Sequence, residues 1–269
     1  MARSIVLTAV LTATAATASV SAHDFWLAAT SVAGPPRVFT VTGNVGETFP
    51  TADTNVTPDR VDAWRIIGPG GESLTTTADF VQAGQSVATS AALPMRGPYL
   101  GVMTIKPREI EMTGDEFTEY LLEEGLTRIV ADRARHGKAT TKARERYARY
   151  AKIVVGNGEG TSAHLMERVG AKAEFVPLRN PSRLLPGDTF AVQLLVEGRP
   201  VSGAQVSALT HGVKLNARTD EEGVAAFITS KPGPWLIRTV HMEARDAASP
   251  VDWESYWVSL SFEISEQTR

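Results

Sequence analysis

The chain has 269 residues, a formal net charge of −3 and no cysteine. The lack of cysteine excludes disulfides and thiolate chemistry, so a metal site would have to use histidine, carboxylate, backbone groups or the amino terminus. The slightly acidic balance argues against general nucleic-acid binding.

The first 22 residues have the pattern of a secretory signal peptide. A basic start precedes an apolar stretch over residues 5–18, and a cut after Ala22 would have small residues at positions −3 and −1. That stretch is too short to span a membrane, and no later stretch is long enough. We therefore expect a periplasmic or secreted chain that begins at His23 and has no membrane segment. A cut after Ala18 is the alternative.

From residue 37 to about residue 106 the pattern favours short β-strands. Apolar and polar residues alternate, and turns rich in glycine, such as residues 68–71, separate the runs. Strands of this length and spacing predict an N-terminal β-sandwich. The expected strands are 37–43, 60–67, 86–93 and 99–106.

A helical insert is predicted at about residues 113–155. Thr113 and Glu116 have the spacing of a capping box, and Gly125 is placed to end the helix that follows. Further helices are expected at 127–135 and 141–154.

Charge is unevenly spread over this region. Residues 109–124 carry seven acidic side chains and no basic one, whereas residues 128–152 carry nine lysines and arginines. We expect the acidic and basic segments to pair with each other on a solvated face. The alternative is a basic docking patch for an acidic partner.

Beyond residue 175 the β pattern returns. The fold class we predict is mainly β, with two β-sandwich domains. Residues 23–178 form the first domain and carry the insert, and residues 179–269 form an Ig-like or prealbumin-like sandwich. The expected strands of the second domain are 189–197, 201–210, 215–219, 224–229, 235–243 and 257–264.

A histidine at the new chain end has a chemistry that an internal histidine lacks. The α-amine and Nδ1 of His23 can close a six-membered chelate ring on one metal ion, and both nitrogens release protons at modest cost near neutral pH. Nitrogen donors suit Ni(II), Co(II), Cu(II) or Zn(II) rather than Mg or Ca. Asp24 would add an oxygen ligand or orient the imidazole. The apolar residues 25–27 directly behind should hold this end in place.

Further ligands must come from elsewhere in the chain. Alternation along the strand at 235–243 puts His241 on one face, and His164 follows a glycine-rich segment. The predicted metal site therefore comprises His23, His241, Asp24 and His164, although a buried structural role is the default for any internal histidine.

Signatures of catalysis are missing from the sequence. It contains no HExxH zinc motif, no Gly-x-Ser-x-Gly elbow and no P-loop, so we do not expect an enzyme. A different class of function, a structural or carbohydrate-binding β-sandwich, is the alternative. Trp253, Tyr256 and Trp257 would supply its aromatic platform.

Segments spread along the chain carry a family resemblance: His23–Leu27, Glu119–Leu126, Arg144–Lys152, Gly198–Ala204, Thr219–Phe227, Gly233–Leu236 with His241, and Asp252–Trp257. Together they resemble a family of bacterial exported proteins, formerly a domain of unknown function, that is named for the nickel-uptake substrate-specific region. The resemblance implies a periplasmic accessory protein that binds nickel or cobalt and supports a membrane metal-uptake system. The Gly203-Ala204 element and the segment Thr219–Phe227 also look like prealbumin-like and carboxypeptidase-regulatory-like modules.

Overall fold

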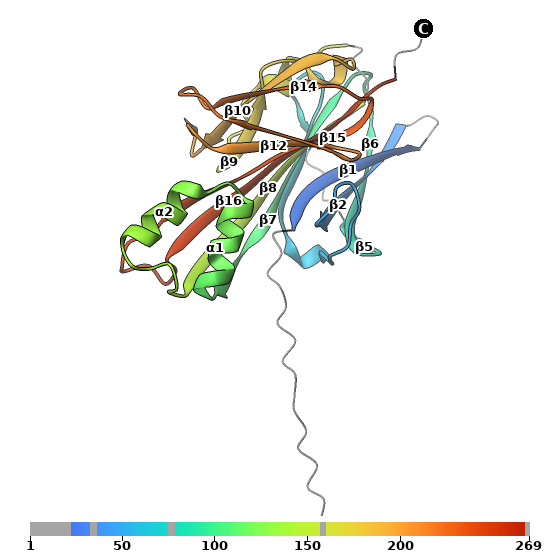
Figure 1. Ribbon diagram of the computed structural model, residues 1–269. Helices are drawn as coiled ribbons and strands as arrows, with labels where there is room; N and C mark the ends of the chain where they lie inside the picture. Colours follow the sequence, from blue (N-terminus) through green and yellow to red (C-terminus); the bar gives the residue numbers. More distant parts are fainter. Residues whose placement is uncertain (1–22, 33–36, 75–78, 157–159, 267–269) are drawn as a thin grey trace, which may run out of the picture.

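The computed structural model describes residues 23–32, 37–74, 79–156 and 160–266. The predicted signal peptide lies outside these residues. The protein is mainly β, and its strands form several sheets that are joined by turns and two short helices (Figure 1).

Within the described residues the strands form three sheets. The first, the N-terminal sheet, has the order β1 (Asp24–Val32), β2 (Arg37–Gly46), β6 (Ser86–Leu93), β5 (Val81–Ala83). The second, the C-terminal sheet, has the order β11 (Arg199–Pro200), β10 (Asp188–Val196), β14 (Val224–Thr229), and β9 (Ala173–Pro177) also pairs with β10. The third, the central sheet, has the order β13 (Val213–Arg218), β12 (Gln205–Thr210), β15 (Gly233–Ala244), β16 (Trp253–Ile264), β8 (Ala143–Val155), β7 (Tyr99–Met112), β3 (Val61–Ile67), β4 (Ser73–Leu74).

The central sheet joins the two halves of the chain. Strand β16 pairs in parallel with β8, from Trp253 opposite Glu145 to Ser261 opposite Ile153. The two sandwiches therefore share one long sheet, which Figure 1 shows running through the middle of the molecule. Strand β9, from the predicted first domain, pairs with β10 of the predicted second one.

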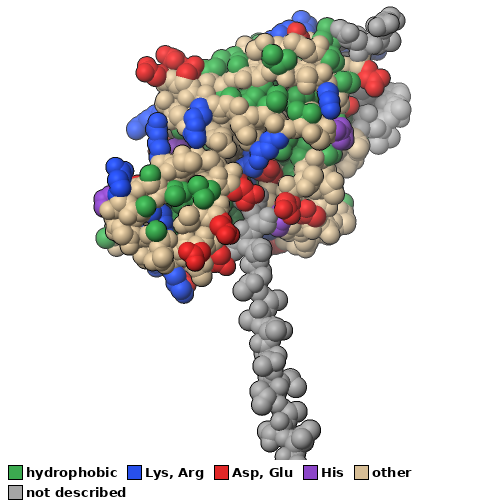
Figure 2. All heavy atoms as spheres, in the orientation of Figure 1, with side chains coloured by type: hydrophobic (Ala, Val, Ile, Leu, Met, Phe, Trp, Pro, Cys, Tyr) green, Lys and Arg blue, Asp and Glu red, His purple; other side chains and the backbone are tan. Residues whose placement is uncertain are grey.

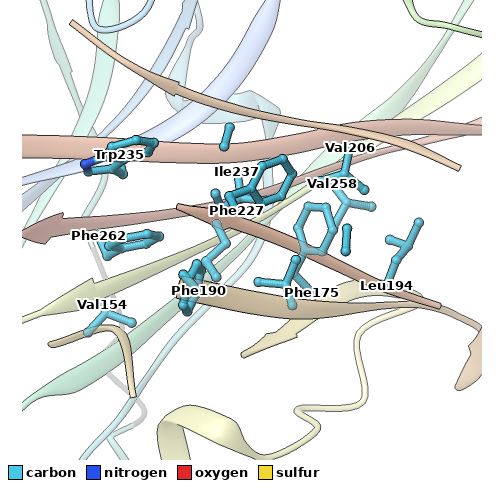
Figure 3. Close-up of a cluster of buried hydrophobic side chains, with 14 of the residues drawn as sticks. Val154, Phe175, Phe190, Leu194, Val206, Phe227, Trp235, Ile237, Val258 and Phe262 are labelled. Atoms are coloured by element: carbon cyan, nitrogen blue, oxygen red, sulfur yellow. The ribbon is translucent and has the colours of Figure 1, made fainter. Parts of the chain in front are cut away.

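Each face of the central sheet has its own core. Along β7, Met103 and Ile105 belong to the cluster beneath the N-terminal sheet, whereas Leu100 and Val102 belong to the cluster beneath the C-terminal sheet. This follows from the two-residue period of a strand, which sends neighbouring side chains to opposite faces. Figure 3 shows the second cluster, in which Val154, Phe175, Phe190, Leu194, Val206, Phe227, Trp235, Ile237, Val258 and Phe262 are labelled.

The capping-box prediction is confirmed at the start of helix α1 (Gly114–Glu123). The backbone N–H of Thr113 donates to the Glu116 carboxylate at 2.8 Å, and the backbone N–H of Glu116 donates to Thr113 Oγ1 at 3.3 Å. Gly125 follows with φ +70°, a left-handed conformation that ends the helix and that glycine adopts without strain. Helix α2 (Thr127–Arg135) has the predicted bounds.

The helix expected at residues 141–154 is wrong, because this segment is strand β8. Alanine, arginine, glutamate and lysine favour helix locally, but β8 pairs with β7 on one side and with β16 on the other, and that pairing overrides propensity. Within the described residues the helical insert therefore ends with α2.

The acidic and basic segments do pair, but across two strands. Arg146 lies 2.5 Å from Glu109, and Lys142 lies 2.8 Å from Glu111, so bases of the β8 segment neutralise acids of β7. Figure 2 shows side chains of both signs and hydrophobic side chains over the helical region of this face, without a continuous basic surface.

The described residues also include three short 3-10 turns, at Pro58–Arg60, Ala163–Met166 and Pro181–Arg183. In the part of the chain that the structure describes, neither α1 nor α2 nor any other helix has the length and apolarity needed to cross a bilayer.

Candidate functional site

The amino-terminal end of β1 is anchored against the central sheet. Phe25 and Leu27 are buried in the cluster beneath the N-terminal sheet, while Trp26 is buried on the other side of the strand against Phe49 and Leu236. Burying each of these large side chains contributes about 1.5–3 kcal/mol. The expectation that residues 25–27 hold this end of the chain segment in place is therefore met.

His23 is held by two contacts at this anchored end. Its backbone oxygen accepts a hydrogen bond from Arg149 Nη2 at 3.1 Å. Its Nδ1 lies 3.3 Å from Thr54 Oγ1, and the Thr54 hydroxyl donates to Asp53 Oδ1 at 2.9 Å. The imidazole, the hydroxyl and the Asp53 carboxylate thus form a short polar chain.

His23 lines a cavity of about 700 Å³ between the N-terminal sheet, the central sheet and α1. This volume lies within the range of sites that bind small organic molecules. Apolar side chains form part of its wall, and the polar part includes Thr54, Tyr120, Glu145 and Tyr147.

Three arginines also line this cavity: Arg60, Arg108 and Arg149. Arg149 lies over the rings of Tyr147 and Trp257, with centroid distances of 5.4 and 5.6 Å. Burial lowers the pKa of Arg149, and the nearby charges of Arg60 and Arg108 lower it further.

Glu145 is a buried carboxyl in the same wall. Tyr120 donates to its Oε1 at 3.1 Å, and the Ser255 hydroxyl donates to the same oxygen. Burial raises the pKa of Glu145 and outweighs these two hydrogen bonds, which favour the charged form.

The Asp24 carboxylate forms an ion pair with Arg238. Its Oδ1 lies 3.0 Å from Nε of Arg238, and Glu124 forms a second ion pair with the same guanidinium. Burial raises the pKa of Asp24, and it also raises the pKa of Glu124 to about 7, because two carboxyls share one cation away from water. The predicted role of Asp24 at the metal is replaced by this triad, because β1 turns the Asp24 side chain toward β15.

His241 lies on the opposite face of the central sheet from His23. Its ring stacks on Tyr256, with centroids 6.2 Å apart, and its Nε2 lies 3.5 Å from Glu243. Arg238, three residues earlier on β15, points to the other face, where it meets Asp24. The sheet therefore separates His241 from the cavity, and the structure does not bring the predicted histidine pair together.

His164 is also remote from His23. It is buried, and its Nε2 lies 3.1 Å from the carbonyl oxygen of Pro98, to which the ring donates. Pro98 precedes β7, whereas the cavity is lined from Ile105 onward, about 20 Å further along that strand at 3.3 Å per residue. His164 is a hydrogen-bonded core histidine, and burial lowers its pKa.

The aromatic platform of the carbohydrate-binding alternative is not formed. Trp253 packs on Phe117 of α1 at 5.9 Å, and Trp257 stacks on Tyr120 at 6.0 Å. Tyr256 is fully buried on the opposite face of β16, as alternation requires. These three rings therefore offer no common exposed surface for a sugar.

No group of three or more histidine, aspartate or glutamate side chains is arranged to hold a metal ion among the described residues. The α-amine that cleavage would create at His23 is a further donor that such side chains do not include. A site here would consist of that amine, the imidazole and the adjacent Asp53, rather than of the four predicted residues.

Sequence reasoning missed the cavity arginines and the residues around Thr54. The local sequence predicts a helix around Arg149, and a helix hides the alternation of Arg149 with Tyr147 along strand β8. A reading of residues 143–155 with period two would have placed Tyr147, Arg149 and Ala151 on one face. No signal in the sequence connects Arg60 with Arg149.

A comparison with curated proteins gave no match. Among solved structures, the D0-D1 domain of Intimin is similar at 14% sequence identity, with a TM-score of 0.20, over 90% of this chain and 98% of that chain. A family model described as Domain of unknown function (DUF4198) matches residues 20–243. Since this match covers most of the 269 residues, the chain belongs to the DUF4198 family.

Proposed function

We propose that this protein is an exported, non-enzymatic accessory protein that binds a divalent transition metal through His23 and supports metal uptake or delivery. One observation carries the proposal: the residue expected to become the chain end is fixed in the wall of a cavity. The Arg149 bond to its carbonyl and the buried residues behind it hold His23 there. A fixed terminus holds its amine and imidazole together, which lowers the entropy lost on chelation.

The donor set consists of nitrogen and oxygen. The amine and Nδ1 of His23 would form the chelate. The Asp53 carboxylate, which is connected to His23 through the Thr54 hydroxyl, would add an oxygen ligand. Nδ1 must exchange its Thr54 contact for the metal. The α-amine must lose its proton before it can coordinate, so metal binding releases a proton from the terminus. His241 and His164 take no part in this arrangement.

Nickel or cobalt is the cargo that the family resemblance suggests, in a periplasm served by a membrane metal-uptake system. The donors fit Ni(II), Co(II), Cu(II) and Zn(II), and the general affinity order places Cu(II) first. The cargo in the cell would therefore depend on which metal the compartment offers.

The test begins with protein that a bacterial host has exported and processed. Intact mass establishes whether the chain begins at His23, and calorimetry then measures binding of the four metals. We expect binding of one ion per chain, accompanied by proton release. Absence of binding by all four metals to chain with the correct mass would refute the proposal.

Two variants separate the chelate from other metal contacts. One extra alanine between Ala22 and His23 moves the amine by about 3.8 Å, the spacing of successive Cα atoms, and should weaken binding at least tenfold. His241→Ala is the matched control, because that ring lies across the sheet, and its affinity should equal that of the wild type. Equal binding by the inserted variant would contradict a terminal chelate.

A further inference from the structure

The cavity collects positive charge from separate parts of the chain. Arg60 ends a 3-10 turn, Arg108 follows a bulge in β7, and Arg149 lies on β8, yet all three line the same space. Burial lowers the pKa of Arg60, and the nearby charge of Arg108 adds to this. Three guanidinium groups in one cavity repel one another unless anions neutralise them.

None of these three arginines forms an ion pair within the described residues. Arg60 donates to the carbonyl oxygen of Lys106 at 2.6 Å, and Arg149 donates to that of His23 at 3.1 Å. Asp59 and Asp24 attract Arg60 and Arg149 only from a longer range.

On strand β8, the arginine on the face opposite to Arg149 does have a counter-charge within the fold. Arg146 of β8 lies 2.5 Å from Glu109, so its charge is neutralised within the fold. The charges that face the cavity are not.

The carboxyl in the cavity wall does not supply the missing charge. Glu145 accepts hydrogen bonds from Tyr120 and Ser255, and among the described residues it forms no ion pair with any of the three cavity arginines. The Asp53 carboxylate accepts hydrogen bonds from Thr54 and from the backbone N–H of Glu47. In the part of the chain that the structure describes, neither carboxyl is ion-paired with the three arginines, which leaves their N–H groups available to an anion from solution.

Arg149 is prepared to receive such an anion. Its guanidinium lies over the rings of Tyr147 and Trp257, which orient it, and its buried Nε has no hydrogen-bond partner within the described residues. A planar fork with free N–H groups matches a carboxylate, which accepts two parallel hydrogen bonds.

The volume indicates an organic anion. A cavity of about 700 Å³ is far larger than one simple inorganic ion needs, and Ile105, Ile110 and Met112 give it an apolar wall. Arginines on three separate elements suit a ligand that carries several separated charges on a carbon skeleton.

We propose that this cavity binds a small organic polycarboxylate, a di- or tricarboxylate whose carboxylates are held by Arg60, Arg108 and Arg149. This site goes beyond the metal proposal and does not depend on it, because the arginines contact the anion whether or not His23 holds an ion.

The test uses processed, metal-free protein and calorimetry with citrate, succinate and inorganic phosphate in a chelator-free, low-salt buffer. We expect citrate to bind more tightly than succinate and at least tenfold more tightly than phosphate, with affinity that falls as salt rises. No binding of citrate or succinate at millimolar concentration, or phosphate binding as tight as that of citrate, would overturn the proposal.

Variants then locate the bound anion. Arg108→Gln and Arg60→Gln should each weaken citrate binding at least tenfold. Arg199→Gln is the matched control, because it removes the same charge from the exposed strand β11, outside the cavity wall, and its affinity should stay at the wild-type value. Full citrate affinity in both cavity variants would contradict the assignment.

Metal and anion tests fail independently. The alanine inserted before His23 addresses the metal proposal, and it leaves Arg60 and Arg108 in place. Loss of metal binding with retained citrate binding would therefore contradict only the metal proposal. Loss of citrate binding with retained metal binding would contradict only the anion proposal.

Discussion

Replacing Glu124 by glutamine should change how the stability of this protein depends on pH. Glu124 is buried beside Asp24, and both carboxyls lie against the single guanidinium of Arg238. Desolvation is the largest influence and raises the pKa of Glu124 from 4.5 to about 7. Glutamine has nearly the same shape and can still accept a hydrogen bond from Arg238, but it cannot ionise.

Proton linkage determines whether the free energy of unfolding rises or falls with pH. Between the unfolded value of 4.5 and the folded value of about 7, the folded chain holds a proton that the unfolded chain has lost. Raising the pH through this window therefore favours the unfolded state. At about 1.4 kcal/mol per pH unit, Glu124 removes about 3 kcal/mol of stability between pH 4.5 and 8. The stability of the Glu124→Gln variant should not fall in this way, because glutamine does not ionise.

Urea unfolding followed by tryptophan fluorescence at intervals from pH 5 to pH 8.5 measures the effect. Relative to the wild type, Glu124→Gln should gain about 2.5 kcal/mol between pH 5 and pH 8.5. Glu119→Gln is the matched control, because that carboxyl on the same helix is exposed and is not among the charges that shift the pKa of Glu124, and its profile should parallel the wild type. Parallel profiles for the wild type and Glu124→Gln would show that the buried carboxyl is ionised throughout, and the linkage reasoning would be refuted.

Three further substitutions test the fold by the same urea assay. Glu174→Gln leaves the buried Lys152, now 2.6 Å from the Glu174 carboxylate, without its counter-charge, and should cost about 3–5 kcal/mol. The added change Lys152→Met should recover part of that loss, and a double variant less stable than the single one would contradict this. Thr113→Ala removes the cap of α1 and should cost about 1 kcal/mol, against no change for the exposed Thr141→Ala. Phe190→Ala opens the C-terminal core and should cost about 3–5 kcal/mol, and a loss below 1 kcal/mol would mean that this core does not carry the stability assigned to it.

Local features were predictable where a few neighbouring residues determine the geometry. The capping box at Thr113, the turn at Gly125 and the bounds of α2 depend on residues within one or two helical turns. Strands β6 and β14 were predicted with their observed bounds, since alternation and flanking turns are also local.

Strand β8 shows where local information fails. Its alanines and charged residues favour helix, and only pairing with β7 and with a strand more than 100 residues away makes it extended. The same error concealed the cavity, because Arg149 reaches it only if the segment alternates as a strand.

The sequence by itself determined a cysteine-free, mainly β chain with a histidine at the expected cut and an amphipathic helix after a capping box. Tertiary structure alone decided which residues share a site. It placed His241 across a sheet from His23, gave Asp24 to Arg238, and brought Arg60, Arg108 and Arg149 around one cavity. The physical reason is range: propensity and capping act over a few residues, whereas the bond from Arg149 to His23 joins positions 126 residues apart, and only the pairing of distant strands sets such contacts.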